Sequence, residues 1–272
     1  MLYKSTSELL TTILLQLVIG IYTSHSYESN SEEHCSHSAN SHSAPVQSLN
    51  DPQLAKCASN SNTNMALVVY EEKQNFLERF YDDKWHYTCK DKVLSVKQKW
   101  TELGVAGVVW DAATVLSDFL QGKAELVKGK KVLEIGAGTG LVGLYSNVLG
   151  AEVTITDRQE VLDHIRNVVK HNELDNSRLT VAELDWTKNY PEFGTFDVIV
   201  GADVIYIESL FQDLLKTLTN LSNSETVVFL SCKIRYDKDW RFIDMLKKTM
   251  HVEEVLHDKD RDIRIFKANK VV

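Results

Sequence analysis

The residues with the clearest chemical potential lie around a glycine-rich turn. Residues 136–140 read GAGTG and follow a short apolar run, 131–135. Glycine lets a backbone come close to a ligand, and the helix predicted after the turn offers free N–H groups at its start. Asp157 ends the next apolar run, where its carboxylate could accept hydrogen bonds from the hydroxyls of a ribose. We therefore expect a ribose-containing cofactor at this turn, the alternative being a tight turn capped by a surface carboxylate.

Two kinds of cofactor contain such a ribose. Gly138, Gly140 and Gly143 satisfy the spacing of the dinucleotide fingerprint. Glu134, two residues before Gly136, suits a cofactor with a cationic amino group better than one with a pyrophosphate, and S-adenosylmethionine has that amino group. A nicotinamide-dependent oxidoreductase is the alternative, but no tyrosine in the chain is followed by a lysine four residues later.

Aromatic and acidic residues follow two later predicted strands. Trp186 comes after the strand 179–184, where its flat ring could stack on adenine. Asp203 and Tyr206 come after the strand 196–200. Ligands of open parallel sheets bind beyond the carboxyl ends of the strands, so both are expected at the mouth of the site. The alternatives are a core aromatic for Trp186, a helix cap for Asp203 and a packed ring for Tyr206.

The elements that must position these residues alternate along the chain. Strands are predicted at 131–135, 152–156, 179–184, 196–200 and 226–231, and helices at 141–148, 161–171, 210–221 and 240–250. This alternation predicts an α/β fold, a Rossmann-like and mostly parallel sheet with helices on both faces. The last two predicted strands, 252–255 and 262–267, have no helix between them, which indicates a C-terminal antiparallel hairpin.

The first 64 residues have a different composition. Residues 9–22 form an uncharged apolar run that is shorter than the roughly 20 residues of a spanning helix. It is either a signal or anchor, or part of an extension upstream of a domain that begins at Met65. Residues 23–64 are rich in serine and asparagine and are predicted to be disordered. We therefore expect an N-terminal extension, 1–64, and one catalytic domain, 65–272.

Composition excludes several classes of protein. A net charge of −8 and a pI near 5.6 argue against a general nucleic-acid or anionic-membrane binder. The clustered histidines of the N-terminal tail, His34, His37 and His42, have no scaffold to fix a metal, so no metal site is expected. Four scattered cysteines fit a reducing compartment. We expect a cytoplasmic monomer, or a protein of the secretory pathway if 9–22 acts as a signal.

The glycine motif resembles that of a large enzyme family. Glu134, Gly136, Gly138 and Gly140 match motif I of the seven-strand (class I) S-adenosylmethionine-dependent methyltransferases, and Asp157 matches its acidic partner. The resemblance covers residues 65–270. It implies the Rossmann-like seven-stranded sheet of that family and S-adenosylmethionine as the cofactor.

A second set of motifs resembles the protein-lysine branch of these enzymes. Residues 203–206 (DVIY) are similar to its Asp/Glu-x-x-Tyr signature, and the segments 65–72, 107–111 and 232–236 are similar to the methyltransferase-like-21 subfamily, most of all to its member that acts on seventy-kilodalton heat-shock chaperones. The resemblance implies a protein-lysine N-methyltransferase with a chaperone as partner. The alternatives are a small-molecule methyltransferase, a lysine methyltransferase of another ATPase or an elongation factor, and a catalytically idle binding protein.

The resemblance also implies a role for each matching residue. The residues expected to bind the cofactor are Trp110, Glu134, Gly136, Ala137, Gly138, Asp157, Trp186 and Ala202. Asp203 and Tyr206 are expected to border the channel of the substrate lysine, where Asp203 orients the amine or the cofactor's amino group and is not assigned as a general base. The polar segments 70–72 and 78–99 are expected to form a hairpin over the pocket with an acidic rim for a basic substrate, or else a solvated face.

Overall fold

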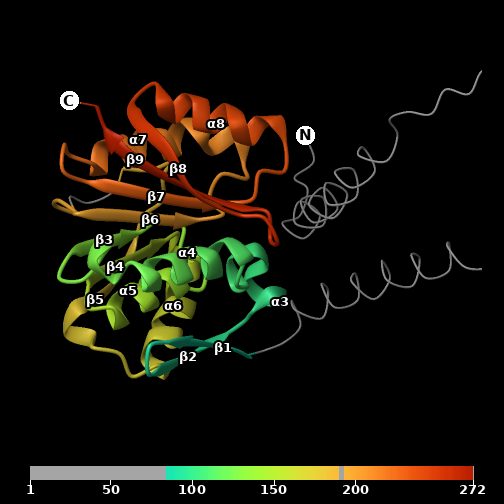
Figure 1. Cartoon of the computed structure of the whole chain (residues 1–272). Coiled ribbons are helices and arrows are strands. Elements are labelled where there is room, and N and C mark those ends of the chain that lie inside the picture. The colour runs from blue at the N-terminus through green and yellow to red at the C-terminus, as the bar shows by residue number, and fades with distance from the viewer. Residues whose placement is uncertain (1–83, 190–192, 272) are drawn as a thin grey trace, which may run out of the picture. The chain divides into compact units, whose positions relative to one another are not determined.

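The computed structural model describes residues 84–189 and 193–271, which belong to one compact unit (Figure 1). The apolar run 9–22, the serine-rich tail 23–64, the boundary at residue 64 and the segment 65–72 lie outside the described residues. The predictions made for them stay predictions.

A seven-stranded sheet carries the fold. Its strand order is β5-β4-β3-β6-β7-β9-β8. The strands are β3 (Lys131–Glu134), β4 (Glu152–Asp157), β5 (Leu179–Glu183), β6 (Val198–Ala202), β7 (Val227–Cys232), β8 (Met250–Asp258) and β9 (Ile263–Lys270). The five strands β3 to β7 are parallel, whereas β9 runs antiparallel to both β7 and β8. The predicted α/β fold and C-terminal hairpin are confirmed.

Helices cover both faces of this sheet (Figure 1). One face carries α4 (Asp111–Gly122), α5 (Leu141–Val148) and α6 (Gln159–His171), and the other carries α7 (Phe211–Leu221) and α8 (Asp237–Lys247). Successive strand residues point to opposite faces, so Val132 joins the core under α4, α5 and α6, and Leu133 joins the core under α7 and α8. Burial on both faces explains why the parallel strands read as apolar runs.

The last helix differs from its predicted range, 240–250. Helix α8 begins at Asp237 because Asp239 Oδ2 accepts hydrogen bonds from the backbone N–H groups of Arg235 and Tyr236, at 2.8 and 3.0 Å, and so caps the helix start. It ends at Lys247, and β8 begins at Met250. The acidic residues of the first turn were the overlooked start signal.

A two-stranded hairpin, β1 (Lys84–Cys89) and β2 (Lys92–Lys97), precedes the sheet. Its Ser95 exchanges two backbone hydrogen bonds with the side chain of Asn172 at the end of α6, and Tyr145 of α5 donates to Thr88 O. The prediction that the hairpin lies over the pocket is therefore wrong for these strands, which pack against the helices. The short elements around them are α3 (Trp100–Leu103), η2 (Gly104–Gly107), η3 (Ala124–Leu126), η4 (Asn176–Arg178) and η5 (Glu208–Leu210).

Within the described ranges, no single helix has both the length and the apolar character to cross a membrane. One bent pair, Trp100–Gly107 with Asp111–Gly122, meets the length and composition criteria only when the two helices are taken together.

Candidate functional site

The carboxyl ends of β3 and β6 mark the position of the site. Strand β3 pairs with β4 on one side and with β6 on the other, and the chain passes through β4 and β5 before it returns to β6. The strand order therefore reverses between β3 and β6, which is where open parallel sheets bind ligands. The glycine loop follows β3, and Asp203 and Tyr206 follow β6. The fold thus brings the two predicted groups to one edge of the sheet.

The glycine loop adopts a backbone conformation that favours glycine. The φ angles of Gly136 and Gly138 are 56° and 55°. A Cβ atom at Gly136 would lie 2.9 Å from Val204 Cγ1 and 3.1 Å from Trp186 Cζ2, and one at Gly138 would lie 3.0 Å from Ala106 O. The loop therefore passes directly against Trp186 on one side and against η2 on the other. Residues 136–138 stay half-buried, so their backbone can be reached from solvent.

Two hydrogen bonds fix the surroundings of this loop. Ala137 N donates to Thr156 O at 3.0 Å, which ties the loop to β4. Trp110 Nε1 donates to Val105 O at 2.9 Å, which fixes the segment between η2 and α4. Trp110 is half-buried at the start of α4. Trp110 therefore belongs to the segment that joins η2 to α4 and not to the glycine loop itself. Its contact with a cofactor stays a prediction.

Asp157 anchors the loop from the end of β4. Its Oδ2 accepts a hydrogen bond from Gly138 N at 2.8 Å, and its Oδ1 accepts one from Arg158 N at 2.7 Å. Burial raises the pKa of this carboxyl, against the opposing effect of these two N–H groups. Each oxygen has further lone pairs. Asp157 is therefore placed to hold the glycine loop and to accept hydrogen bonds from a ligand at the same time.

Glu134 lies behind the glycine loop. The side chain is only 2% exposed, and its Oε2 accepts a hydrogen bond from Gly143 N at 2.9 Å in the first turn of α5. Burial raises the pKa of Glu134 to about 8, with Asp157 adding to the rise and the Gly143 N–H opposing it. This contact assigns Glu134 a supporting role beneath the loop. The direct contact with a cationic cofactor group that its residue type suggested stays a prediction.

Gly143→Ala is expected to destabilise the domain by about 1–3 kcal/mol, because it overpacks a closed contact. A Cβ atom there would lie 2.5 Å from Glu134 Oε2 and 2.6 Å from Ile155 Cγ1. Urea unfolding followed by circular dichroism measures the change. Gly122→Ala in α4 is the matched control, since a Cβ at Gly122 meets nothing within 4 Å. It should be neutral or slightly stabilising, and equal stability of the two variants would contradict the packing argument.

Trp186 and Ala202 complete the wall around the loop. Leu184 N donates to Asp157 O at 2.9 Å and so brings the segment that carries Trp186 to the end of β4. Trp186 Nε1 is buried and has no hydrogen-bond partner within the described residues. Ala202 ends β6 and is half-buried beside the reversal of strand order. Their positions suit a flat ring against Trp186 and a backbone contact at Ala202.

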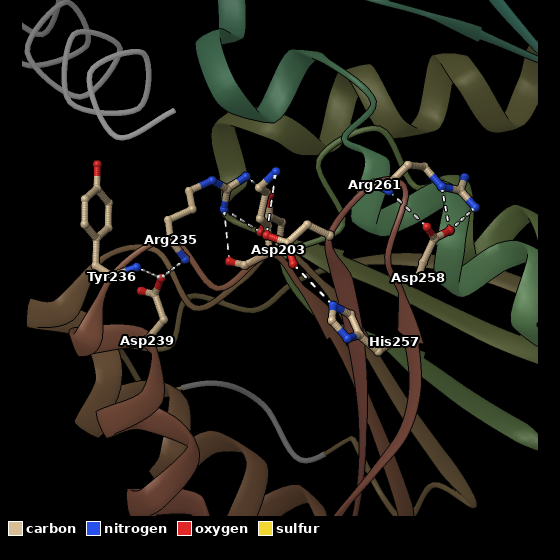
Figure 2. Close-up of polar contacts among 9 residues, drawn as sticks. Asp203, Arg235, Tyr236, Asp239, His257, Asp258 and Arg261 are labelled. Atoms are coloured by element: carbon tan, nitrogen blue, oxygen red, sulfur yellow. Dashed lines mark hydrogen bonds and ion pairs between the residues drawn. The ribbon is translucent and has the colours of Figure 1, made fainter. Parts of the chain in front are cut away.

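Asp203 forms a buried ion pair with a residue that was given no role from the sequence, Arg235 (Figure 2). Arg235 Nη1 donates to Asp203 Oδ1 at 3.0 Å, and Nη2 donates to Oδ2 at 2.9 Å. The side chains are 9% and 13% exposed. Asp203 has a φ of 54°, and its N–H donates to Ser231 O at 2.7 Å. Both the backbone and the carboxylate of Asp203 are therefore fixed.

Tyr206 stands near both acidic residues of the site. Burial raises the pKa of its hydroxyl, and the charge of Asp157 adds to this rise, followed by that of Asp203. Lys238 Nζ donates to the backbone carbonyl of Tyr206. The structure therefore brings Asp157, Asp203 and Tyr206, which come from two separate strand ends, within electrostatic reach of one another.

Sequence reasoning missed three residues that shape the site: Ala106 against Gly138, Arg235 on Asp203, and Lys238 on Tyr206. Arg235 and Lys238 follow β7, the neighbour of β6 in the sheet. Charged residues just beyond the carboxyl end of a neighbouring strand were the signal available, because such ends meet at one edge. No comparable signal exists for Ala106.

Taken together, the residues fit a cofactor that contains a ribose and a flat base. Three features lie side by side at the end of β3: a buried carboxylate with lone pairs left to accept hydrogen bonds, a half-buried glycine backbone and an indole face. A second polar region, Asp203 with Tyr206, follows the adjacent strand. Such an arrangement can hold a cofactor on one side and present a second reactant on the other.

Comparisons of the sequence with known proteins agree with this arrangement. Residues 88–249 match the family described as "Lysine methyltransferase". The protein N-lysine methyltransferase METTL21A of Danio rerio is 45% identical over 214 residues, which cover 76% of this chain and 97% of that protein. The EEF1A lysine methyltransferase 3 of Xenopus tropicalis is 34% identical over 207 residues, which cover 75% of this chain and 92% of that protein.

A solved structure agrees with the fold. The 16S rRNA N2 G1207 methyltransferase RsmC of T. thermophilus, in complex with AdoMet and guanosine, superposes with a TM-score of 0.57 at 18% identity. The match covers 69% of this chain and 50% of that one. At this identity the likeness concerns the architecture of the sheet and its helices.

Proposed function

Because this chain belongs to the lysine methyltransferase family, we propose that it transfers methyl groups from S-adenosylmethionine to a lysine of a seventy-kilodalton heat-shock chaperone. Family membership makes it an S-adenosylmethionine-dependent protein-lysine N-methyltransferase. Its substrate is therefore a protein. The identity of that protein and the roles of single site residues are the proposal.

One observation carries the assignment of roles. The loop after β3 and the loop after β6 meet at the reversal of strand order, with Asp157 bonded to the first and Asp203 fixed in the second. We assign the first loop to the cofactor and the second to the lysine.

The cofactor half of the site uses backbone and aromatic groups. Asp157 accepts hydrogen bonds from the ribose hydroxyls, and Trp186 flanks the adenine. The backbone of Gly136, Ala137 and Gly138 borders the ribose and methionine portions. The other residues assigned to this half are Trp110 and Ala202, with Glu134 acting from behind through the start of α5.

Methyl transfer to a neutral amine requires little general-acid catalysis. When bound, S-adenosylmethionine supplies an electrophilic methyl group carried on a sulfonium. The chain's own contribution is to align the lysine amine with that group, and alignment of this kind can supply about 7–11 kcal/mol of barrier lowering. The amine must be neutral to react, although the pKa of a free lysine is about 10.4. A half-buried channel favours the neutral form.

Asp203 and Tyr206 hold the lysine in this proposal. Tyr206 presents an aromatic face, which attracts an ammonium or methylammonium group by about 0.5–2 kcal/mol. Asp203 has lone pairs left after its two bonds to Arg235, and one of them can accept an N–H of the amine. Water takes the proton that the lysine releases.

The choice of a chaperone rests on the subfamily resemblance of the sequence. The greater similarity to the METTL21A proteins than to the EEF1A lysine methyltransferase 3 proteins supports it. An elongation-factor substrate is the second candidate, since the latter relatives match a similar share of the chain, 75% and 79%.

A labelling experiment tests the proposed substrate. The full chain is incubated with radiolabelled S-adenosylmethionine and either a purified seventy-kilodalton heat-shock chaperone, purified elongation factor EEF1A or a soluble lysate. Label is expected on the chaperone and in one lysate band of its size. Asp203→Ala should lose at least 90% of this label, whereas Asp163→Ala, an exposed carboxylate of α6, should keep it. Label on EEF1A alone, or only in the small-molecule fraction, would overturn the substrate assignment.

A further inference from the structure

We propose that Arg235 is a positioning residue that neutralises Asp203, so that the substrate lysine enters the channel as a reactive free amine. The inference deepens the proposed function and rests on it. It assigns Arg235 an electrostatic effect on the reactant, exerted through Asp203.

The geometry of the pair limits what Asp203 can do alone. Two parallel hydrogen bonds, of 3.0 and 2.9 Å, join the guanidinium to both carboxylate oxygens (Figure 2). Such two-pronged pairs are strong and directional. Both side chains are almost buried, so solvent does not screen the pair as it screens a surface ion pair. Asp203 therefore faces the channel as one half of a neutral unit.

Both halves of this unit are held in place. Asp239 Oδ2 accepts the backbone N–H groups of Arg235 and Tyr236, and Arg235 Nη1 also lies 3.4 Å from Lys233 O. In the same segment, Lys238 binds the carbonyl of Tyr206. The segment after β7 thus holds Asp203 by one side chain and Tyr206 by another, three residues apart.

The charge of Asp203 affects the protonation of the substrate lysine. An opposite charge within about 4–6 Å stabilises the ionised form of a group and shifts its pKa by about 1–3 units. A lone carboxylate at Asp203 would therefore bind the lysine tightly as an ammonium, which cannot accept a methyl group. Arg235 cancels most of that field and leaves lone pairs of Asp203 to orient the amine.

Other charged and titratable groups surround the pair. Asp239 and Cys232 act on Arg235, Asp203 and Arg264 act on Cys232, and Asp157 and Arg158 act on Tyr206. The other charged or titratable groups of the adjoining elements are Lys233, Lys238, His257 and Asp262. Two of these cations have carboxylate partners of their own, since Lys233 pairs with Asp262 at 4.0 Å and Arg264 pairs with Glu254 at 2.8 Å, and Lys238 donates to the carbonyl of Tyr206. Within the described residues, Arg235 is the cation bonded to Asp203.

The dependence of kcat and KM on pH tests the proposal. The full chain, Arg235→Gln and Arg235→Lys are assayed between about pH 6.5 and 9.5 with the protein substrate identified by labelling. For Arg235→Gln we expect the rising limb of kcat to move up by about one pH unit or more. Its kcat at pH 7.5 should fall about tenfold while KM does not rise. Arg235→Lys keeps the charge, so its limb should stay at the wild-type pH although kcat falls because the two-pronged geometry is lost.

The controls separate this effect from a structural one. Arg178→Gln removes an exposed arginine–aspartate pair at the far end of β5 and should leave the profile unchanged. Calorimetry with S-adenosylmethionine should give wild-type affinity for Arg235→Gln. An unshifted limb, or an equal loss of kcat at every pH, would overturn the proposal. If Arg235→Gln does not fold, a shifted limb in Arg235→Lys overturns it. A wild-type chain that labels no protein refutes the proposed function instead.

Discussion

Asp157→Ala is expected to weaken the binding of S-adenosylmethionine by about 100-fold or more. The carboxylate accepts hydrogen bonds from Gly138 N at 2.8 Å and from Arg158 N at 2.7 Å, so its removal loosens the loop that borders the cofactor. It also removes the acceptor proposed for the ribose hydroxyls. Hydrogen bonds to a charged group contribute about 1.5–3 kcal/mol each, and about 1.4 kcal/mol is a factor of ten in affinity. Isothermal titration calorimetry on the purified full chain measures the change.

Two further variants sharpen the interpretation of Asp157. Asp157→Asn presents one acceptor oxygen in place of two, so it must give up one of the two backbone bonds, and an intermediate loss of affinity is expected. Asp163→Ala removes an exposed carboxylate from α6 and should bind like the wild type. Wild-type affinity in Asp157→Ala, with the variant folded by circular dichroism, would refute the assignment of Asp157 to the ribose.

The parallel part of the sheet could be predicted because each strand is a short apolar run between turn signals. Residues 152–156 illustrate this, since Val153 and Ile155 both enter the core under α5 and α6. The glycine loop could be predicted because glycine favours positive φ angles, and Gly136 and Gly138 do have them. Local pattern and local conformation agree at these positions.

Contacts between distant segments could not be predicted. Asp203 and Arg235 are 32 residues apart, and nothing in their spacing joins them. They meet because β6 and β7 are neighbours in the sheet, which is a property of the strand order. The hairpin of β1 and β2 was predicted, but its predicted position over the pocket was wrong, since the position depends on the pairing of Ser95 with Asn172.

Glu134 shows what the strand period adds to the residue type. A carboxylate before a glycine loop suggested a cationic ligand. Val132, two residues earlier, faces the core that includes α5, and alternation along a strand places Glu134 on the same face. Its observed partner is Gly143 of α5. The alternation of side chains along the strand therefore accounts for this contact, and the contact with a cationic cofactor group stays a prediction.

The burial of Glu134 predicts an unusual dependence of stability on pH. Burial raises its pKa in the folded protein to about 8, from the ordinary value of 4.5 for a glutamate. Between these two pH values the folded state binds a proton that the unfolded state has released. The stability that protonated Glu134 contributes is therefore fully present below pH 4.5 and is lost as pH rises through about 8. The share of the unfolding free energy due to Glu134 should fall by on the order of 5 kcal/mol over this range.

Glu134→Gln isolates this share, because an amide imitates the protonated acid at every pH. The two proteins should have similar unfolding free energies near pH 5, and the variant should be the more stable by several kcal/mol above pH 8. Urea unfolding without cofactor, extrapolated at each pH between 5 and 9, measures the difference. Asp157, whose pKa is also raised, titrates in both proteins, and its charge interaction with Glu134 is part of the difference that the comparison measures. Glu152→Gln, on the exposed first residue of β4, should follow the wild type. Parallel curves for the wild type and Glu134→Gln would mean that Glu134 stays ionised in the folded domain, stabilised by the Gly143 N–H and the start of α5.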